Sequence, residues 1–326
     1  MLLNEVDTMS EQGRIDTHHH VVPPAYRDWL ARRGVAAGGM PIPAWDAATD
    51  IAFMDRHGIA TGVLSLSTPG THLGDDEEAL TWARKVNDHC AETVKDRPDR
   101  FGFFATLPLP HLDGALSETA RALDELGADG IVLLTNHRDT YLGDAAFEPL
   151  MAELDRRGAT VFVHPSQLPA QPVPGLPPYA ADFLLDTVRA AMNLTVSGTV
   201  RRHPSIRFVL SHGGGFLPYA AHRISQSLQH HQQVLGAREG MDHDAVLAGL
   251  QSFHFDTALS TTPQTLAALL SFAGPERVLF GSDFPYASPQ MSSYFIEQYD
   301  AQPLDGALRA AIDRGNAARL LPRLAR

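Results

Sequence analysis

Eight short apolar runs, each followed by a stretch with helical periodicity, constrain the fold of this chain more than any other feature. The runs are rich in Val, Ile, Leu and Phe on both faces, as expected for strands buried on both sides. They predict strands at 15–20, 61–67, 101–107, 130–135, 160–164, 206–212, 253–259 and 277–283. The helical stretches are 48–57, 76–96, 113–126, 145–157, 181–202, 216–236, 263–273 and 304–315.

Strict alternation of eight strands and eight helices predicts an α/β fold, a (β/α)8 TIM barrel. The alternative is an open doubly wound sheet, which normally has fewer strands and a Gly-rich first turn. The length of 326 residues suits one barrel domain. We expect residues 15–326 to form that domain, after a flexible tail at 1–14.

Two long proline-rich segments interrupt the alternation, at 21–47 after the first strand and at 165–180 after the fifth. Loops at the carboxyl ends of barrel strands surround the active site. We therefore expect both insertions to act as lids over that site.

Composition excludes several classes of partner. The net charge is −12 and no stretch is basic, which argues against nucleic acid and against an anionic membrane surface. The longest apolar runs are too short to cross a bilayer, and the acidic first 14 residues do not resemble a signal peptide. The single cysteine, Cys90, excludes an intrachain disulfide and suits the cytoplasm.

Four of the predicted strands end in side chains that bind metals or titrate. Successive strand residues point to opposite faces, so the first and third histidines of the run 18–20 share a face, whereas His19 points away. The strand-end residues are His18, His20, His164, His212 and Asp283.

One histidine at a strand end is more often a hydrogen-bonded structural residue than a ligand, and among 16 histidines a triple run can be accidental. The repetition of the pattern over four strands outweighs that interpretation. Two neighbouring imidazoles, a third from another strand and a carboxylate suit one divalent cation, with Zn²⁺ expected before Mn²⁺.

The same stretches resemble the amidohydrolase superfamily, within it the branch of metal-dependent non-oxidative decarboxylases that includes aminocarboxymuconate semialdehyde decarboxylase and γ-resorcylate decarboxylase. The resemblance implies that His18, His20, His164 and Asp283 hold the metal and that His212 is an active-site histidine beside it. The matching stretches are 15–20, 163–165, 211–215 and 280–285.

Three further segments are similar to the 6-methylsalicylate decarboxylases of that branch. This similarity implies 6-methylsalicylate as substrate and 3-methylphenol as product. The segments are 54–60, 100–105 and 141–143.

Lysine positions separate this chain from the binuclear members of the superfamily, which usually bridge two metals with a carbamylated lysine after the fourth strand. The predicted strand 130–135 contains no lysine, and the only lysines of the chain are Lys85 and Lys95, both before the third strand. We therefore expect a mononuclear site.

One metal still permits two reactions. In a decarboxylase, Asp283 is the candidate donor of a proton to the ring carbon that bears the carboxylate, with His212 tuning it or orienting the substrate. In a hydrolase, Asp283 would accept a proton from metal-bound water before attack on a lactone or an amide. Residue types do not separate these reactions; the motif resemblance favours decarboxylation.

The expected substrate is a small aromatic carboxylic acid, and five residues are candidates for binding it. Each aromatic candidate is also explained by packing in the core or a lid. For the arginine, the resemblance implies contact with the substrate of a neighbouring subunit, hence a homodimer or higher even oligomer; a surface salt bridge is the alternative. The candidates are Trp45, Phe183, Arg223, Phe284 and Tyr286.

Three other features receive simpler interpretations. We expect Asp16 to support the histidines rather than to bind metal. Residues 213–215, three glycines, are expected to permit close backbone packing beside His212. The three histidines of the predicted helix 216–236 should face solvent; they are His222, His230 and His231.

Overall fold

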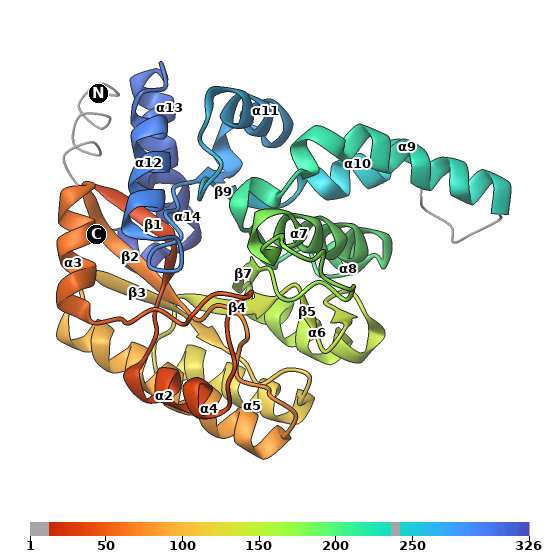
Figure 1. The fold of residues 1–326 in the computed structure, drawn as a ribbon. Helices are drawn as coiled ribbons and strands as arrows, with labels where there is room; N and C mark the ends of the chain where they lie inside the picture. Colours follow the sequence, from red (N-terminus) through yellow and green to blue (C-terminus); the bar gives the residue numbers. More distant parts are fainter. Residues whose placement is uncertain (1–12, 236–241, 326) are drawn as a thin grey trace.

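The computed structural model describes residues 13–235 and 242–325. Its main sheet has the strand order β1-β2-β3-β4-β7-β8-β9-β10, and all neighbouring strands are parallel (Figure 1). These strands are β1 (Arg14–His20), β2 (Ile59–Ser65), β3 (Phe101–Thr106), β4 (Gly130–Leu134), β7 (Thr160–His164), β8 (Arg207–Leu210), β9 (His254–Asp256) and β10 (Val278–Leu279). A small antiparallel hairpin, β5 (Asn136–His137) and β6 (Thr140–Tyr141), follows β4.

The chain beyond β10 closes the sheet against β1. The backbone N–H of Thr17 donates to the Phe280 carbonyl at 3.0 Å, and that of His20 donates to the Phe284 carbonyl at 2.7 Å. A parallel bridge joins His19 to Phe284. The predicted TIM barrel is therefore confirmed.

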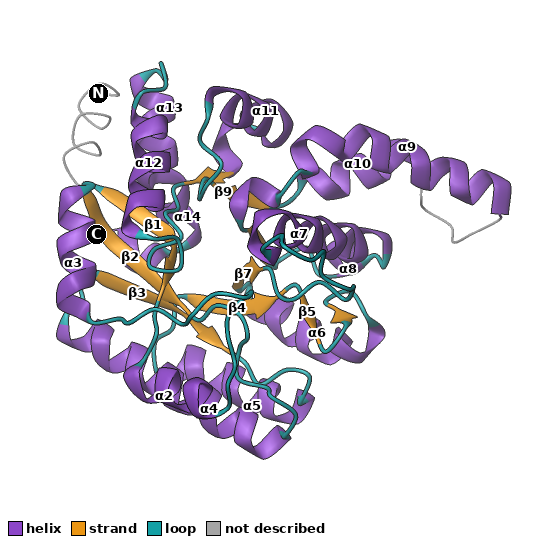
Figure 2. Ribbon diagram, viewed as in Figure 1, coloured by secondary structure: helices purple, strands orange, loops and turns teal. Residues whose placement is uncertain are grey.

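Helices surround this barrel (Figure 2). They are α2 (Pro24–Arg32), α3 (Ala47–Arg56), α4 (Asp76–Asp96), α5 (Leu112–Asp124), α6 (Glu148–Arg157), α7 (Pro178–Val196), α8 (Thr199–Arg202), α9 (Leu217–Leu235), α10 (His243–Gln251), α11 (Pro263–Ala273), α12 (Pro289–Asp300), α13 (Gly306–Ala310) and α14 (Asn316–Leu320). Short helical turns are η1 (Ala145–Phe147), η2 (His212–Gly214), η3 (Pro275–Arg277), the π-helical turn η4 (Ala311–Gly315) and η5 (Pro322–Ala325).

The core has two parts. The larger lies between the strands and the surrounding helices. The smaller fills the barrel, with one residue from each of seven strands and a plug from α14 and the turn after it. The strand members are Ile15, Val63, Phe104, Val132, Phe162, Val209 and Leu279, and the plug residues are Ala317, Leu320, Leu321 and Leu324. This packed layer is the floor on which the strand-end residues stand.

Several predicted boundaries were wrong. The predicted helix 181–202 is two helices, because Gly198 adopts a φ of 79° between α7 and α8. The predicted strand 277–283 ends as β10 at Leu279, and the chain then turns. Helices α2, α10, α12 and α14 were not predicted. Both α2 and α12 have a proline in their first turn, where its missing N–H costs nothing, so a residue that usually indicates a loop begins a helix here.

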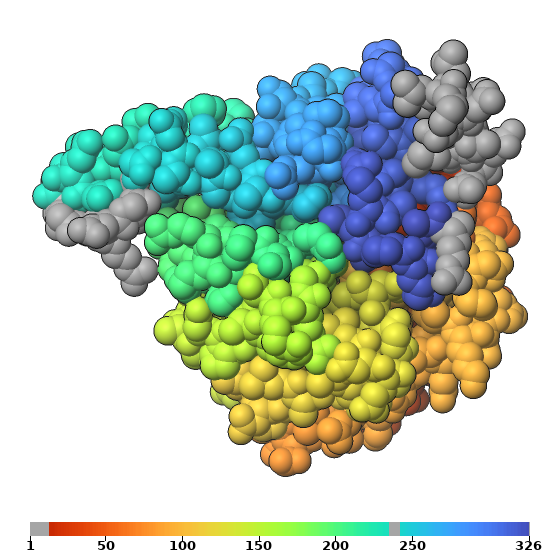
Figure 3. All heavy atoms as spheres, turned by 180° about the vertical axis from the view of Figure 1, so that it is seen from behind, coloured from red at the N-terminus to blue at the C-terminus, as the bar shows by residue number. Residues whose placement is uncertain are grey.

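The first predicted lid contains α2, whereas residues 165–177 carry no helix or strand. Helices α9 and α10 together extend away from the barrel as an arm, which Figure 3 shows from behind. No helix within the two described ranges is long and apolar enough to span a membrane. Residues 1–12 of the predicted tail lie outside the described residues, and β1 begins at Arg14.

Candidate metal centre

The four predicted ligands meet at the carboxyl end of the barrel. One ligand atom from each of them lies within 4.8 Å of the other three, and all four residues are buried. The Nε2 atoms of His18 and His20 are 3.0 Å apart, and Asp283 Oδ1 lies 3.1 Å from the first and 3.0 Å from the second. These residues are His18, His20, His164 and Asp283.

Hydrogen bonds on the outer side of each ring fix which nitrogen faces the centre. His18 Nδ1 donates to Asp256 at 2.7 Å, and His20 Nδ1 donates to the Ser65 carbonyl at 3.2 Å. His164 Nδ1 donates to the Pro165 carbonyl at 2.9 Å. With a metal bound, each Nδ1 would therefore carry the proton, and each Nε2 would present a lone pair inward. Three converging lone pairs beside a carboxylate fit a divalent cation.

Asp256, at the end of β9, was missed in the sequence. Its Oδ2 accepts from His18, and its Oδ1 accepts the backbone N–H groups of His212 at 2.8 Å and Ala258 at 3.0 Å. One carboxylate thus holds the ring of His18 and the backbone of His212. An aspartate in an apolar strand was the available signal, but 238 residues separate it from His18.

The electrostatics of the centre match the ligand forms that a metal requires. Burial, together with repulsion from His20, His18 and His212, holds the pKa of His164 well below its usual value. Burial also lowers the pKa of His20. Although burial opposes ionisation of Asp283, the surrounding histidines hold its pKa well below the usual range. Neutral imidazoles and an ionised carboxylate are the binding forms.

His18 differs from the other two ligands. Burial disfavours its charge, but Asp256 and Asp283 outweigh burial and raise the pKa of His18 to about 10. The protein without metal therefore keeps a proton on His18 at neutral pH, and a cation would replace that proton. Carboxylates that stabilise a positive charge on His18 without metal would also stabilise a metal cation at the same place.

His212 lies beside the centre, with Nε2 3.4 Å from Asp283 Oδ2. Its Nδ1 is buried and has no hydrogen-bond partner among the described residues. His212 has a φ of 54° and Asp283 a φ of 62°, a left-handed conformation that is uncommon for residues other than glycine. Such backbone strain concentrates at functional sites.

The glycines after His212 permit close packing, as predicted. A Cβ on Gly214 would lie 2.8 Å from the ring of Phe255, and one on Gly215 would lie 2.4 Å from the Leu184 carbonyl oxygen. Residues with side chains would push the His212 turn away from the barrel.

His19 points away from the metal ligands, also as predicted. Its Nδ1 contacts Asp16 at 2.9 Å and its Nε2 contacts Asp50 at 3.0 Å, and all three side chains are buried. Asp16 also accepts the backbone N–H groups of His18 at 3.1 Å and Ser282 at 3.0 Å. Asp16 therefore supports both segments that carry ligands and lies outside the ligand group.

Two of the predicted substrate-binding residues lie at the centre. The Phe183 ring lies 6.4 Å from that of His164, and a Cβ on Gly38 of the first insertion would lie 2.5 Å from Phe183 Cζ. The Tyr286 ring lies 5.2 Å from that of His20, and its buried hydroxyl has no hydrogen-bond partner among the described residues. The first insertion thus passes over the ring that flanks His164.

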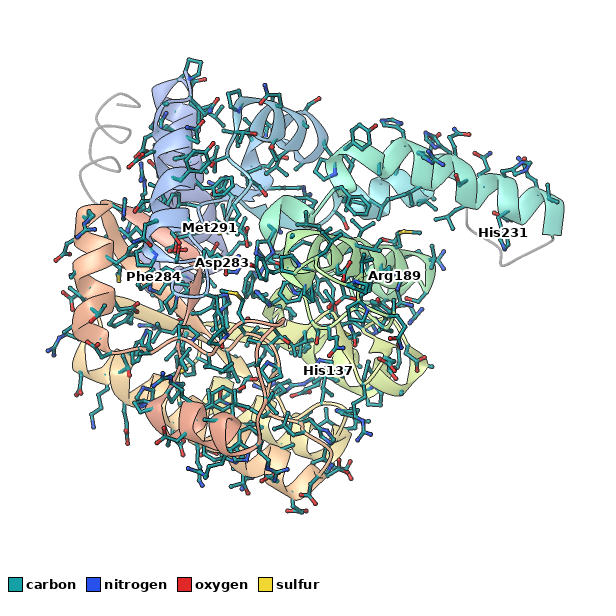
Figure 4. All side chains as sticks on the ribbon, in the orientation of Figure 1. His137, Arg189, His231, Asp283, Phe284 and Met291 are labelled. Carbon is teal, nitrogen blue, oxygen red and sulfur yellow. The ribbon has the colours of Figure 1, made fainter. Side chains whose placement is uncertain are left out.

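The other three candidates lie elsewhere. The Trp45 ring packs at 5.6 Å against His89 of α4. Phe284 is stacked on Phe53 of α3 at 4.0 Å, next to Asp283 in the chain (Figure 4). Arg223 is exposed on α9, and no ion pair joins it to another described residue. His231 of the same helix lies far along the arm from Asp283 in Figure 4.

The model of the amidohydrolase family matches residues 15–323. The chain belongs to the amidohydrolase family. The 6-methylsalicylic acid decarboxylase of Penicillium expansum is 38% identical over 318 residues, which cover 96% of this chain and 97% of the relative. The γ-resorcylate decarboxylase of Rhizobium sp. is 29% identical over 335 residues, which cover 95% of this chain and 98% of the relative.

A solved structure named amidohydrolase II has the same fold as this amidohydrolase. It is 31% identical, with a TM-score of 0.87, and the match covers 95% of this chain and 99% of the other. The expected branch, which includes γ-resorcylate and aminocarboxymuconate semialdehyde decarboxylases, is therefore confirmed. The carbamylated lysine of binuclear members has no counterpart here, because β4 and Thr135 after it contain no lysine.

Proposed function

We propose that this protein decarboxylates 6-methylsalicylate to 3-methylphenol and CO₂. It is a carboxy-lyase of the amidohydrolase family, a metal-dependent decarboxylase of hydroxylated aromatic acids. The observation that carries the finer proposal is the 38% identity, over nearly the whole chain, to a 6-methylsalicylic acid decarboxylase. The buried ligand group with His212 beside it supplies the chemistry.

A single Zn²⁺ or Mn²⁺ held by His18, His20, His164 and Asp283 would supply positive charge that binds the carboxylate and ortho-hydroxyl oxygens of the substrate. Three imidazoles and one carboxylate favour these metals over Ca²⁺ or Mg²⁺, which prefer oxygen ligands. We expect Zn²⁺ first.

The residues of the chain supply the proton. His212 Nε2 is close enough to pass a proton toward Asp283 Oδ2, and Asp283 then donates it to the ring carbon that bears the carboxylate. Asp283 is buried and lies between His212 and the Nε2 atoms of His18 and His20, so its carboxyl is placed to carry a proton from His212 to a ring bound at the metal centre. The carbon–carbon bond then breaks, its electrons return to the ring, and CO₂ leaves.

The binding pocket is proposed to use Phe183 and Tyr286, the aromatic rings beside His164 and His20. The unpartnered hydroxyl of Tyr286 can donate to a substrate oxygen. Trp45 and Phe284 are proposed to support the walls from behind, through their packing on α4 and α3.

We also propose a homodimer or higher even oligomer, in which Arg223 on the exposed face of α9 approaches the neighbouring active site. A cytoplasmic location is proposed on the single, buried Cys90, which leaves no cysteine for an intrachain disulfide.

The test is incubation of purified, metal-loaded protein with a panel of salicylates, with CO₂ and phenol release followed. We expect 6-methylsalicylate to react, and benzoates without the ortho-hydroxyl to react far more slowly, because they lose an oxygen that binds the metal and electron density at the carbon to be protonated. In D₂O the product should carry one deuterium at the carbon that bore the carboxylate. Cleavage of lactones or amides, with every salicylate unchanged, would establish a hydrolase instead.

A further inference from the structure

The peptide group between Pro165 and Ser166 has an unusual pair of partners. Its carbonyl oxygen accepts from His164 Nδ1 at 2.9 Å. Its N–H, on the opposite side of the same planar group, donates to Asp186 Oδ2 at 3.0 Å and to Thr135 Oγ1 at 3.0 Å. One rigid peptide group therefore connects a carboxylate on α7 to the imidazole of a predicted metal ligand.

Asp186 is fully buried and is surrounded by donors. Besides Ser166, it accepts from Thr135 Oγ1, from Asn136 Nδ2 at 3.1 Å and from Tyr141 Oη at 2.6 Å. Burial raises the pKa of Asp186, and these donors oppose that rise. Because every one of these partners donates, the ionised form, which only accepts, satisfies all of them.

The other two ligand histidines provide the comparison. His18 donates directly to a carboxylate, that of Asp256 at 2.7 Å. His20 Nδ1 lies 3.2 Å from both the carbonyl and the hydroxyl oxygen of Ser65, farther than His164 Nδ1 lies from the Pro165 carbonyl. His164 lies between these two cases. It donates to a carbonyl, as His20 does, but the N–H of the same peptide group is bound to a carboxylate.

Hydrogen bonds in series strengthen one another in a medium of low dielectric constant. An ionised carboxylate on the N–H side polarises the peptide group and makes its carbonyl oxygen a stronger acceptor. A stronger acceptor for Nδ1–H holds the ring in one orientation and increases the electron density on Nε2. Both effects favour a cation at the Nε2 side of His164.

We propose that Asp186 is a positioning residue of the metal centre, which acts on His164 through the Pro165–Ser166 peptide group. The residue is on α7, three residues before Arg189, which Figure 4 labels, and it lies outside the group of metal ligands. The proposal depends on metal binding at His164 and not on the identity of the substrate. It is therefore tested without the decarboxylation reaction.

The experiment measures the affinity of metal-free protein for Zn²⁺ by competition with a chromophoric chelator, and records the visible spectrum of the Co²⁺-loaded protein. Asp186→Asn keeps the shape and removes the charge. We expect its Zn²⁺ affinity to fall about 10-fold, within the range of about 10- to 100-fold for outer partners of metal-bound histidines. We also expect its Co²⁺ spectrum to change.

The matched control is Glu118→Gln. Glu118 is a second fully buried carboxylate that accepts from uncharged and charged donors, Asn87 at 2.7 Å and Arg121 at 2.8 Å, and it lies on α5 away from the ligands. This variant should lose stability but keep the Zn²⁺ affinity and the Co²⁺ spectrum of the unmodified protein. If Asp186→Asn has the same Zn²⁺ affinity and the same Co²⁺ spectrum as the unmodified protein, the proposal is overturned and the role of Asp186 is purely structural.

A milder pair of variants covers the case in which Asp186→Asn does not fold. Thr135→Val removes an acceptor of the Ser166 N–H and a donor to Asp186, whereas Tyr141→Phe removes a donor to Asp186 that has no contact with the peptide group. We expect a loss of Zn²⁺ affinity of about 3-fold or more for Thr135→Val, as a fraction of the effect of the whole carboxylate. A Zn²⁺ affinity of Thr135→Val equal to that of the unmodified protein would contradict the proposal.

Discussion

At the scale of single residues, the alternation of the run 18–20 makes a direct prediction. His20→Ala removes a ring from the ligand group, so both bound metal and activity should be lost. His19→Ala should keep the metal, but it leaves Asp16 and Asp50 buried without their shared partner. Its free energy of unfolding should therefore fall by roughly 3–5 kcal/mol. Metal analysis and urea unfolding separate the two effects. If His19→Ala is fully folded but no longer binds metal, His19 does not point away from the ligands as assigned.

Asp283→Asn tests the proposed proton donor. The change preserves shape and removes the acid, so kcat at saturating metal and substrate should fall by about 10²-fold or more, the scale of general acid catalysis. Metal content must be measured alongside, because Asp283 is also a predicted ligand. A variant that keeps metal and retains nearly full kcat would exclude Asp283 as the donor and leave His212.

His254 makes the stability of the fold depend on pH. Burial and the positive charges of Arg277, Arg207 and Arg319 lower the pKa of His254 to about 4. The unfolded chain, with an ordinary histidine pKa of about 6.5, binds the proton first. The free energy of unfolding should therefore fall as pH drops from about 6.5 to about 4, by at most about 1.4 kcal/mol per pH unit from this residue.

Unfolding of His254→Gln by urea across this pH range should show a smaller slope than the unmodified protein. His230→Gln, on the exposed face of α9, is the matched control and should leave the slope unchanged. An unchanged slope in His254→Gln would mean that other groups cause the acid sensitivity.

At the scale of elements, α3 is attached to the barrel by a ring stack. Phe53 of α3 lies on Phe284 with centroids 4.0 Å apart and planes 8° from parallel, and both are buried. Phe53→Ala should therefore cost roughly 3–5 kcal/mol of unfolding free energy, as for other large-to-small core changes. Urea denaturation measures it. Tyr294→Ala, whose residue is 52% exposed on α12, should have a small effect; equal losses would show that the stack is unimportant.

The same stack makes α3 part of the active-site support. Phe284 follows Asp283 directly, so the packing of Phe53 helps to fix the backbone that presents the carboxylate. Asp50 on the same helix binds His19, between two ligand histidines. Helix α3 thus contacts the segments that carry three of the four ligands without contributing a ligand itself.

At the scale of the whole molecule, the arm of α9 and α10 is the feature that a compact monomer would not need (Figure 3). Tyr219 is 90% exposed and Val234 is 62% exposed on α9. Large apolar side chains exposed on a projecting element suit an interface, and we base the assembly prediction on them. We expect light scattering to give the mass of a dimer or higher even oligomer, and Tyr219→Asp to shift it toward the monomer.

Tyr294→Asp, on α12, is the control and should keep the mass of the unmodified protein. A fully active monomer at assay concentration would contradict the proposed assembly and the role of Arg223 in a neighbouring active site.

The sequence by itself determined the barrel and its four ligands. Strand alternation has a fixed period, which placed His18 and His20 on one face, and parallel strands end at the same edge, which brought His164 and Asp283 to them. The sequence also indicated that Asp16 supports the ligand segments, but only the tertiary structure decided which distant groups do so. Asp256 reaches His18 from β9, and Asp186 reaches the peptide group behind His164 from α7, across separations that no local pattern encodes.

The tertiary structure also decided where the side chain of Phe284 points. Beyond Leu279 the chain leaves the strand, and Asp283 turns through a positive φ, so strand alternation no longer predicts the next side chain. Local period governs the residues within an element, whereas packing between distant elements governs what lies behind them and just past their ends.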